Sequence, residues 1–319
     1  MKRASVFLTV VVVLGVVASA NAETVTIDFV TVGNPGNAAD PQTGRGSVAD
    51  TFLMGKYEVT AGQYAAFLNA KAGSDSYGLY NTLMWSSYAG CKIERTGEDG
   101  SYTYSVSNPD MPVTHVNFWN ACRFVNWLHN GQGSGDTEDG VYTLTTATMA
   151  DNTVTRNPGA KYFIPNQDEW YKAAYHDAAN GTYYTFPTSS NDQPANLLPD
   201  PGNSANYYIA GVNTGRGPLT AVGSFNNSAS PYGTFDQAGN VIEWTETILS
   251  GATNCRILRG GEWNWTYYSL RKSDITGWVP GHPGDNNAGS SFRVAATIPE
   301  PGAAMLCLVG AICLLWRRR

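Results

Sequence analysis

The sequence has little charge and few of the side chains that usually carry metal or redox chemistry. Charged residues make up 14% of its 319 residues, and it has 5 cysteines and 4 histidines. It contains no Gly-x-Ser-x-Gly segment, no Gly-Lys-Ser or Gly-Lys-Thr loop and no His-Glu-x-x-His segment. These absences exclude the hydrolase nucleophile elbow, the phosphate-binding loop of nucleotide enzymes and the zinc-protease helix.

Cysteine and histidine are too sparse for a disulfide framework or a recognisable metal motif. Between the terminal segments only Cys91, Cys122 and Cys255 occur. Three thiols allow at most one internal disulfide, with Cys91 pairing with Cys122 or with Cys255, and one thiol is left over. The histidines show no ligand spacing and are expected to be ordinary surface or hydrogen-bonded residues: His115, His129, His176 and His282.

The N-terminal residues 1–22 have the pattern of a secretory signal peptide. Lys2-Arg3 precedes an apolar run from Ala4 to Ala18, and Ala20-Asn21-Ala22 comes just before Glu23. A basic start, a short apolar centre and small residues at the end are typical of a cleaved signal. The alternative is an uncleaved membrane anchor.

The C-terminal residues 298–319 have a three-part pattern. Pro299-Glu300-Pro301 is followed by an apolar stretch from Gly302 to Trp316 and by Arg317-Arg318-Arg319. The stretch is shorter than the roughly 20 residues of a comfortable membrane span, and the arginines favour the cytoplasmic side. The pattern resembles the PEP-CTERM sorting signal. The resemblance implies an exosortase-type processing enzyme as partner, transient anchoring in the inner membrane, and delivery to the cell surface or extracellular matrix; the alternative is a plain tail anchor.

The body between these segments, residues 23–297, is predicted to be one acidic domain. Five of the chain's 20 basic residues lie in the terminal segments, whereas the chain has 26 acidic residues. An acidic body argues against nucleic acid as a partner. Glycine, asparagine and short strand-like runs dominate after residue 181, which favours a loop-rich fold without internal repeats.

Three short helices are predicted from their start signals. One begins at Thr60, where Gln63 completes a capping box, and a second begins near Asn117. The third follows Asn166, with Glu169 completing the box, and ends by Asn180-Gly181. Their apolar faces are expected to pack into the core, together with four tryptophans: Trp119, Trp127, Trp170 and Trp244.

Six phrases, taken in order, resemble the formylglycine-generating enzyme, or sulfatase-modifying factor, family over residues 24–297. The phrases are Glu58–Tyr64, Pro112–Ala121, Ile164–Trp170, Tyr232–Trp244, Leu258–Trp263 and Ser291–Ala295. The resemblance implies an α+β, C-type-lectin-like fold that is rich in loops and low in regular secondary structure. Independently of it, Gly260-Gly261 indicates a close backbone approach or a bulge, and Arg259 and Arg293 are predicted to be buried structural residues.

The chemistry that the resemblance implies lacks its key residues. Family enzymes use two cysteines shortly after the double glycine to bind copper and oxidise a substrate cysteine, and thiolates are suitable Cu(I) ligands. The corresponding stretch here, Trp263–Arg271, contains no cysteine. We therefore predict no copper site and no formylglycine-generating activity.

The resemblance also implies calcium. Its ligands would be the side chains of Asp236 and Glu243 with the backbone carbonyls of Gly239 and Val241; a second site would use Asn206 and the carbonyl of Tyr207. Carboxylate and carbonyl oxygens suit Ca²⁺. The alternative is that Asp236 holds a turn and Glu243 pairs with an arginine.

The segment that replaces the cysteines is rich in aromatic and polar residues. We expect a recognition surface for a polysaccharide or a surface protein on Trp265, Tyr267, Tyr268 and Arg271. Three functions remain open at this point: a non-catalytic binding module, a divergent oxidoreductase or other enzyme on the same fold, and a structural bead of a matrix.

Overall fold

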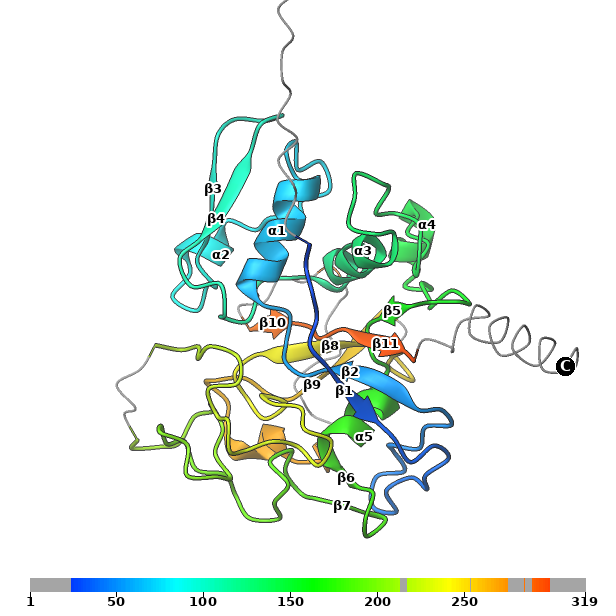
Figure 1. Ribbon diagram of the computed structural model, residues 1–319, viewed down its shortest axis with the longest axis vertical. Helices are drawn as coiled ribbons and strands as arrows, with labels where there is room; N and C mark the ends of the chain where they lie inside the picture. Colours follow the sequence, from blue (N-terminus) through cyan, green and yellow to red (C-terminus); the bar gives the residue numbers. More distant parts are fainter. Residues whose placement is uncertain (1–23, 213–216, 253, 275–283, 285–288, 299–319) are drawn as a thin grey trace, which may run out of the picture.

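Two small sheets cross the middle of the molecule, in a computed structural model that describes residues 24–212, 217–252, 254–274, 284 and 289–298 (Figure 1). The first sheet is antiparallel, in the order β1-β2-β11-β5. Its strands are β1 (Phe29–Val32), β2 (Phe52–Gly55), β11 (Ala295–Thr297) and β5 (Tyr162–Phe163). The last strand of the domain therefore lies between two earlier ones, which ties the two ends of the domain together.

The second sheet has the order β10-β8-β9. Its strands are β10 (Ser290–Ser291), β8 (Ile242–Ile248) and β9 (Arg256–Arg259). β10 pairs with β8 in parallel, whereas β9 is antiparallel to β8 with a register irregularity between Trp244 and Ile248. Two hairpins complete the strands: β3 (Ile93–Thr96) with β4 (Thr103–Val106), and β6 (His176–Asp177) with β7 (Thr182–Tyr183).

The three predicted helix starts are confirmed. α1 (Ala61–Lys71) and α5 (Gln167–Tyr175) begin with complete capping boxes, and Asn117 caps α3 (Phe118–His129) through the N–H of Asn120 at 2.8 Å. Two short helices, α2 (Leu83–Ser86) and α4 (Thr146–Ala150), lie in the loops between them. In Figure 1, α1, α3 and the β3–β4 hairpin lie on one side of the sheets, and α5 lies on the other.

The third helix ends earlier than the Asn180-Gly181 signal. α5 stops at Tyr175 because the chain extends directly into β6. Gly181, with a φ of 64°, lies in the turn that reverses the chain into β7. The left-handed glycine thus closes a hairpin rather than a helix.

Aromatic rings fill the space between the helices and the sheets. Phe124 on α3 contacts Phe67 and Phe292 at centroid distances of 5.5 and 5.4 Å. Trp244 on β8 packs edge-on to Phe118 at 6.0 Å. All four tryptophans predicted to be in the core are buried, and such rings contribute a large part of core stability through their area.

A buried ion pair links β8 of the second sheet to the segment between β10 and β11. Arg293 donates from Nε and Nη2 to the two carboxylate oxygens of Glu243, both at 2.6 Å, and neither side chain is exposed. Arg293 also donates to the carbonyls of Gly55 and Phe235. The predicted structural role of Arg293 is therefore confirmed, and Arg259 is buried as well, with Nη1 bonded to the carbonyl of Asp274 at 2.6 Å.

The architecture confirms the predicted α+β class with few helices, small sheets and abundant loops. Within the ranges described above, no helix has both the length and the apolar character needed to cross a bilayer. The predicted signal peptide and the sorting signal, including Pro299, Glu300, Pro301 and Arg317–Arg319, lie outside the described residues.

Candidate functional site

The double glycine after β9 turns the chain into the predicted recognition segment. Gly260 and Gly261 have φ values of 101° and 72°, which favour glycine strongly. A Cβ atom on Gly261 would lie 2.4 Å from the hydroxyl oxygen of Ser269. The segment therefore folds back against the end of β9, as the predicted close backbone approach requires.

Three of the four predicted recognition residues form one stack. Tyr267 and Tyr268, in the 3-10 helix η1 (Tyr267–Leu270), have stacked rings 4.2 Å apart. The Arg271 guanidinium lies 4.7 and 4.8 Å from the two ring centres, a cation-π arrangement. Tyr268 is 57% exposed, so this stack faces solvent.

Trp265 takes a different position. Its side chain is partly buried and packs against the main hydrophobic core. Its carbonyl accepts a hydrogen bond from the Tyr208 N–H at 2.8 Å. Trp265 therefore holds a second exposed tyrosine close to the segment.

A small cavity of about 140 Å³, which we call the aromatic cleft, lies beside Tyr208. Residues lining it include Tyr88, Asn206, Tyr207, Tyr208, Val212 and Trp263. Tyr88 and Tyr208 are 72% and 50% exposed, and Tyr88 meets Trp263 edge-on at 6.1 Å. Large exposed rings next to a cavity are typical of ligand-binding surfaces.

Trp263, which lines this cleft, carries an unused hydrogen-bond donor. Its indole Nε1 is buried and has no hydrogen-bond partner among the described residues. A buried donor without a partner costs about 1–3 kcal/mol. Such a group is expected where a ligand or a water molecule supplies the acceptor.

The predicted calcium ligands are brought only partly together. Asn206 forms a bridge with Gly239, and its carbonyl accepts the Asn240 N–H at 2.7 Å. Asp236, with a φ of 61°, accepts the Gly223 N–H at 2.5 Å. The Tyr207 carbonyl accepts from the Asn196 side chain at 2.6 Å, so several predicted ligand atoms already have protein partners.

Glu243 does not fit a calcium ion in this arrangement. Arg293 engages both of its oxygens, and the Trp170 indole N–H donates to Oε2 at 2.7 Å. The alternative in which Asp236 holds a turn and Glu243 pairs with an arginine describes these contacts. Within the described part of the chain, no three His, Cys, Asp or Glu side chains form a group able to hold a metal. Calcium binding through the other predicted residues stays a prediction.

Glu58 is a functional candidate that the sequence analysis missed. It is 2% exposed, its Oε1 accepts from the Asn240 amide at 3.3 Å, and its Oε2 has no hydrogen-bond partner in the described part of the chain. Burial, followed by the charge of Asp236, raises the pKa of Glu58 well above its ordinary value. Burial likewise raises the pKa of Asp236 to about 6, so both carboxyls are costly to ionise.

No disulfide joins any two of the body cysteines. Cys91 and Cys122 are buried, whereas Cys255 is partly exposed. Burial raises the pKa of both Cys91 and Cys122, which disfavours the thiolate form that binds copper. Neither of the disulfide pairings left open for Cys91 occurs.

The sequence signals for the missed residues were local and weak. Glu58 opens the phrase that caps α1, and Tyr88 lies in an irregular loop after α2. Tyr208 directly follows Asn206-Tyr207, a pair that the family resemblance marks only as calcium ligands. Their proximity to the rest of the site depends on tertiary packing, and a single sequence does not show it.

Comparison with known proteins supports the fold. The profile described as "Sulfatase-modifying factor enzyme 1-like domain" matches residues 9–298. The crystal structure of CarF is similar at a TM-score of 0.60 and 22% identity, over 86% of this chain and 99% of that chain. Treponema denticola variable protein 1 is similar at a TM-score of 0.51 and 18% identity, over 87% and 97% of the two chains.

A third solved structure, PvdO from Pseudomonas aeruginosa, has a TM-score of 0.47 and 19% identity, over 85% and 92% of the two chains. No curated protein sequence matches this chain. At such low identities, the CarF and Treponema similarities show a shared fold and carry no statement about activity.

Proposed function

This chain belongs to the family of sulfatase-modifying factor enzyme 1-like domains, and from that premise we propose that it is a non-catalytic polysaccharide-binding module. The stretch in which the family resemblance requires two cysteines, Trp263–Arg271, has none. The same stretch instead supplies Trp263, Tyr267 and Tyr268 to an exposed aromatic surface. The domain would then serve as a scaffold for recognition.

The observation that carries this proposal is the aromatic cleft with its unused indole N–H. Tyr88 and Tyr208 offer exposed ring faces against which the apolar face of a sugar ring can lie. Trp263 Nε1 offers a donor to a sugar hydroxyl. A few polar groups placed among aromatic walls are typical of small-ligand sites.

The proposed location is the cell surface or the extracellular matrix. The signal-like N-terminus and the PEP-CTERM-like C-terminus support secretion, processing by an exosortase-type enzyme, and contact with the inner membrane before processing. A polysaccharide ligand agrees with such a location. A surface protein is the competing ligand, and the binding test below separates the two.

The binding test uses affinity gel electrophoresis of the full chain in gels that contain hydroxyethyl cellulose, dextran or alginate. We expect retardation by at least one of these polysaccharides. Replacing both Tyr208 and Tyr268 by Ala should weaken the association constant about tenfold or more, because central aromatic contacts commonly contribute more than 1 kcal/mol each.

Two further variants make the test specific. Trp263→Phe keeps the ring but removes the N–H and should also weaken retardation. Tyr77→Ala removes a tyrosine that is 49% exposed but does not line the cleft, and should leave retardation unchanged. The proposal is wrong if none of the three polysaccharides retards the protein, or if the Tyr208 and Tyr268 double variant migrates like the parent.

The absence of oxidase activity is tested separately. Purified protein is incubated with copper, oxygen and a peptide that contains Cys-x-Pro-x-Arg, and the peptide mass is then measured. We expect an unchanged mass, because Trp263–Arg271 contains neither of the cysteines that the family resemblance requires as copper ligands. Conversion of the peptide cysteine to formylglycine would contradict the non-catalytic assignment and favour the divergent oxidoreductase.

A further inference from the structure

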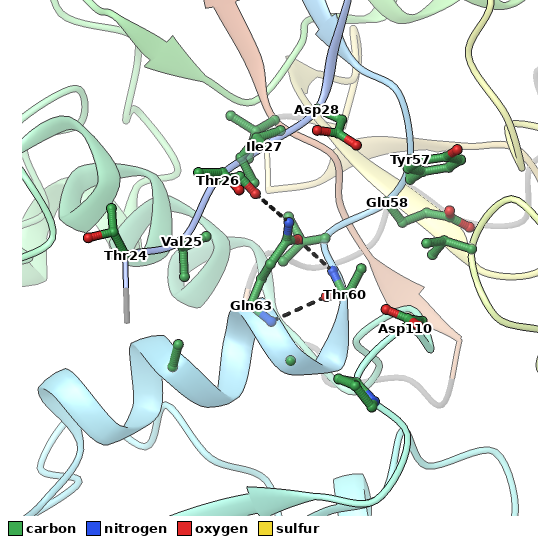
Figure 2. Close-up of a pocket in the computed structure, with 16 residues that line it drawn as sticks. Thr24, Val25, Thr26, Ile27, Asp28, Tyr57, Glu58, Thr60, Gln63 and Asp110 are labelled. Atoms are coloured by element: carbon green, nitrogen blue, oxygen red, sulfur yellow. Dashed lines mark hydrogen bonds between the residues drawn. The ribbon is translucent and has the colours of Figure 1, made fainter. Parts of the chain in front are cut away.

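A second cavity, larger than the aromatic cleft, lies between the N-terminal segment and the start of α1 (Figure 2). Its volume is about 430 Å³, within the usual range for small-molecule sites. It shares no lining residue with the aromatic cleft. We call it the acidic cavity, because its charged lining residues are Asp28, Glu58 and Asp110.

The lining is acidic, and the opposing charge that acts on Glu58, that of Arg293, comes from outside the lining. No Lys, Arg or His is among the described residues that line it. In Figure 2 the three acidic side chains lie toward one end of the cavity, away from Thr24 and Val25. Asp28 and Asp110 are exposed, whereas Glu58 is buried. A cationic ligand would therefore meet two exposed carboxylates and one buried carboxyl group, whose ionised form the bound cation would stabilise.

Among the three lining carboxyls, Glu58 has a buried oxygen, Oε2, without a hydrogen-bond donor in the described part of the chain. The nearby side chains of Arg293 and Gln63 do not donate to it. Arg293 is committed to Glu243 and to the carbonyls of Gly55 and Phe235. Gln63 is also committed: its Oε1 accepts the Thr60 N–H and its Nε2 donates to the Thr26 carbonyl, at 2.9 and 2.8 Å. The Glu58 Oε2 atom is thus a buried acceptor without a donor among the described residues.

The remainder of the lining suits an apolar body. Ile27, Val59, Ala66, Val222 and Val294 contribute aliphatic surface, and the Tyr57 ring also lines the cavity. A hydrated metal ion would leave this surface without a partner, and Ca²⁺ requires six to eight oxygen ligands. A short alkyl chain with an ammonium group matches both features: the ammonium group can donate to Glu58 Oε2, and the alkyl chain can pack against the aliphatic lining.

We propose that the acidic cavity binds a primary aliphatic amine, with its ammonium group donating to Glu58 Oε2 and its alkyl chain lying against the aliphatic lining. Asp28 and Asp110 attract the cation at the exposed edge of the cavity. This site is separate from the aromatic cleft, and its occupancy does not depend on the polysaccharide proposal.

The test is isothermal titration of the full chain with pentylammonium chloride, with the equally long neutral 1-pentanol as the reference ligand. We expect pentylammonium to bind at least about tenfold more tightly than 1-pentanol, because a hydrogen bond to a charged group is worth about 1.5–3 kcal/mol. Glu58→Gln should abolish this preference. Asp110→Asn should reduce pentylammonium affinity about twofold, because an exposed charge interacts weakly through solvent.

Two control variants test whether the loss of amine binding is specific to Glu58. Glu98→Gln makes the same charge change at an exposed position in the β3–β4 turn and should keep the affinity of the parent. The Tyr208 and Tyr268 double variant should keep it too, so failure of the polysaccharide proposal would leave this result standing. Glu58→Gln is expected to melt at or above the temperature of the parent, because its amide can keep the bond to Asn240 without a buried charge.

Three results would overturn the proposal. The first is equal binding of pentylammonium and 1-pentanol by the parent protein. The second is full pentylammonium affinity in Glu58→Gln. The third is displacement of pentylammonium by millimolar calcium in the parent together with loss of calcium binding in Glu58→Gln, which would assign Glu58 to a metal.

Discussion

At the scale of single residues, the partner of each buried carboxyl limits the role that the carboxyl can have. Glu243, Asp236 and Glu58 lie in one buried region around Arg293, whose charge acts on all three carboxyls. Arg293 neutralises Glu243 directly through two hydrogen bonds, whereas the other two carboxyls keep raised pKa values. Glu243 is thus held by protein partners, whereas Glu58 keeps one oxygen without a donor among the described residues.

Replacing Glu243 by Gln should destabilise the protein by about 3–5 kcal/mol, because it leaves the buried Arg293 charge without its partner. Urea unfolding followed by tryptophan fluorescence measures this loss. The double variant Glu243→Leu with Arg293→Met should lose less stability than Glu243→Gln, because it removes both charges together.

The same experiment separates pairing from metal binding. If Arg293 is the partner of Glu243, the loss of stability is equal in EDTA and in millimolar calcium. A loss seen only in calcium would show that Glu243 acts as a calcium ligand.

At the scale of elements, the turn after β9 positions the proposed recognition surface. The double glycine allows η1 to lie against the strand end, and η1 carries the stack of Tyr267, Tyr268 and Arg271. The Tyr208 loop is joined to the same segment through the carbonyl of Trp265. The proposed recognition surface therefore depends on the close approach of Gly261 to the Ser269 side chain.

Replacing Gly261 by Ala should lower both stability and polysaccharide retardation. The new Cβ would lie 2.4 Å from Ser269 Oγ, and its φ of 72° is unfavourable for alanine. We expect a loss of more than 1 kcal/mol in urea unfolding, since forced close packing typically costs 1–3 kcal/mol.

Gly251→Ala is the matched control for the cost of placing alanine at a positive φ. Gly251 has a φ of 85°, but a Cβ there would meet no atom within 4 Å. It should cost less stability than Gly261→Ala and leave retardation intact. Equal effects of the two substitutions would show that the close approach to Ser269 is unimportant.

At the scale of the whole molecule, the three body thiols lie in or beside three different elements. Cys122 lies within α3, while Cys91 and Cys255 precede β3 and β9. The first two are buried, and burial raises their pKa values. Burial thus makes Cys91 and Cys122 poor thiolate donors, and the absence of a copper site stays a prediction.

Alkylation of the native full chain at pH 8 with iodoacetamide, followed by peptide mass mapping, should modify Cys255 rapidly and leave Cys91 and Cys122 unmodified. Thiolate reactivity depends on access and on pKa. All three should react in urea. Recovery of a disulfide-linked pair among them, or rapid native modification of Cys122, would contradict the arrangement described here.

The local sequence was sufficient for the parts of the fold that depend on near neighbours. The capping boxes at Thr60 and Asn166 place donor and acceptor three residues apart, so α1 and α5 begin where they were predicted. The end of α5 was less predictable, because pairing with β7 competes with continuation of the helix. The buried tryptophans and the α+β class likewise followed from pattern and family resemblance.

The sequence by itself determined the helix starts, the tight glycine turn and the lack of cysteines after it, because each depends on residue type within a few positions. Only the tertiary structure decided which partners Glu243 and Glu58 have, since Arg293 and Asn240 reach them from distant parts of the chain. It also brought Tyr88 and Tyr208 to Trp263. Burial and long-range packing, which set the cost of a charge and the position of a ring, do not appear in the order of residues.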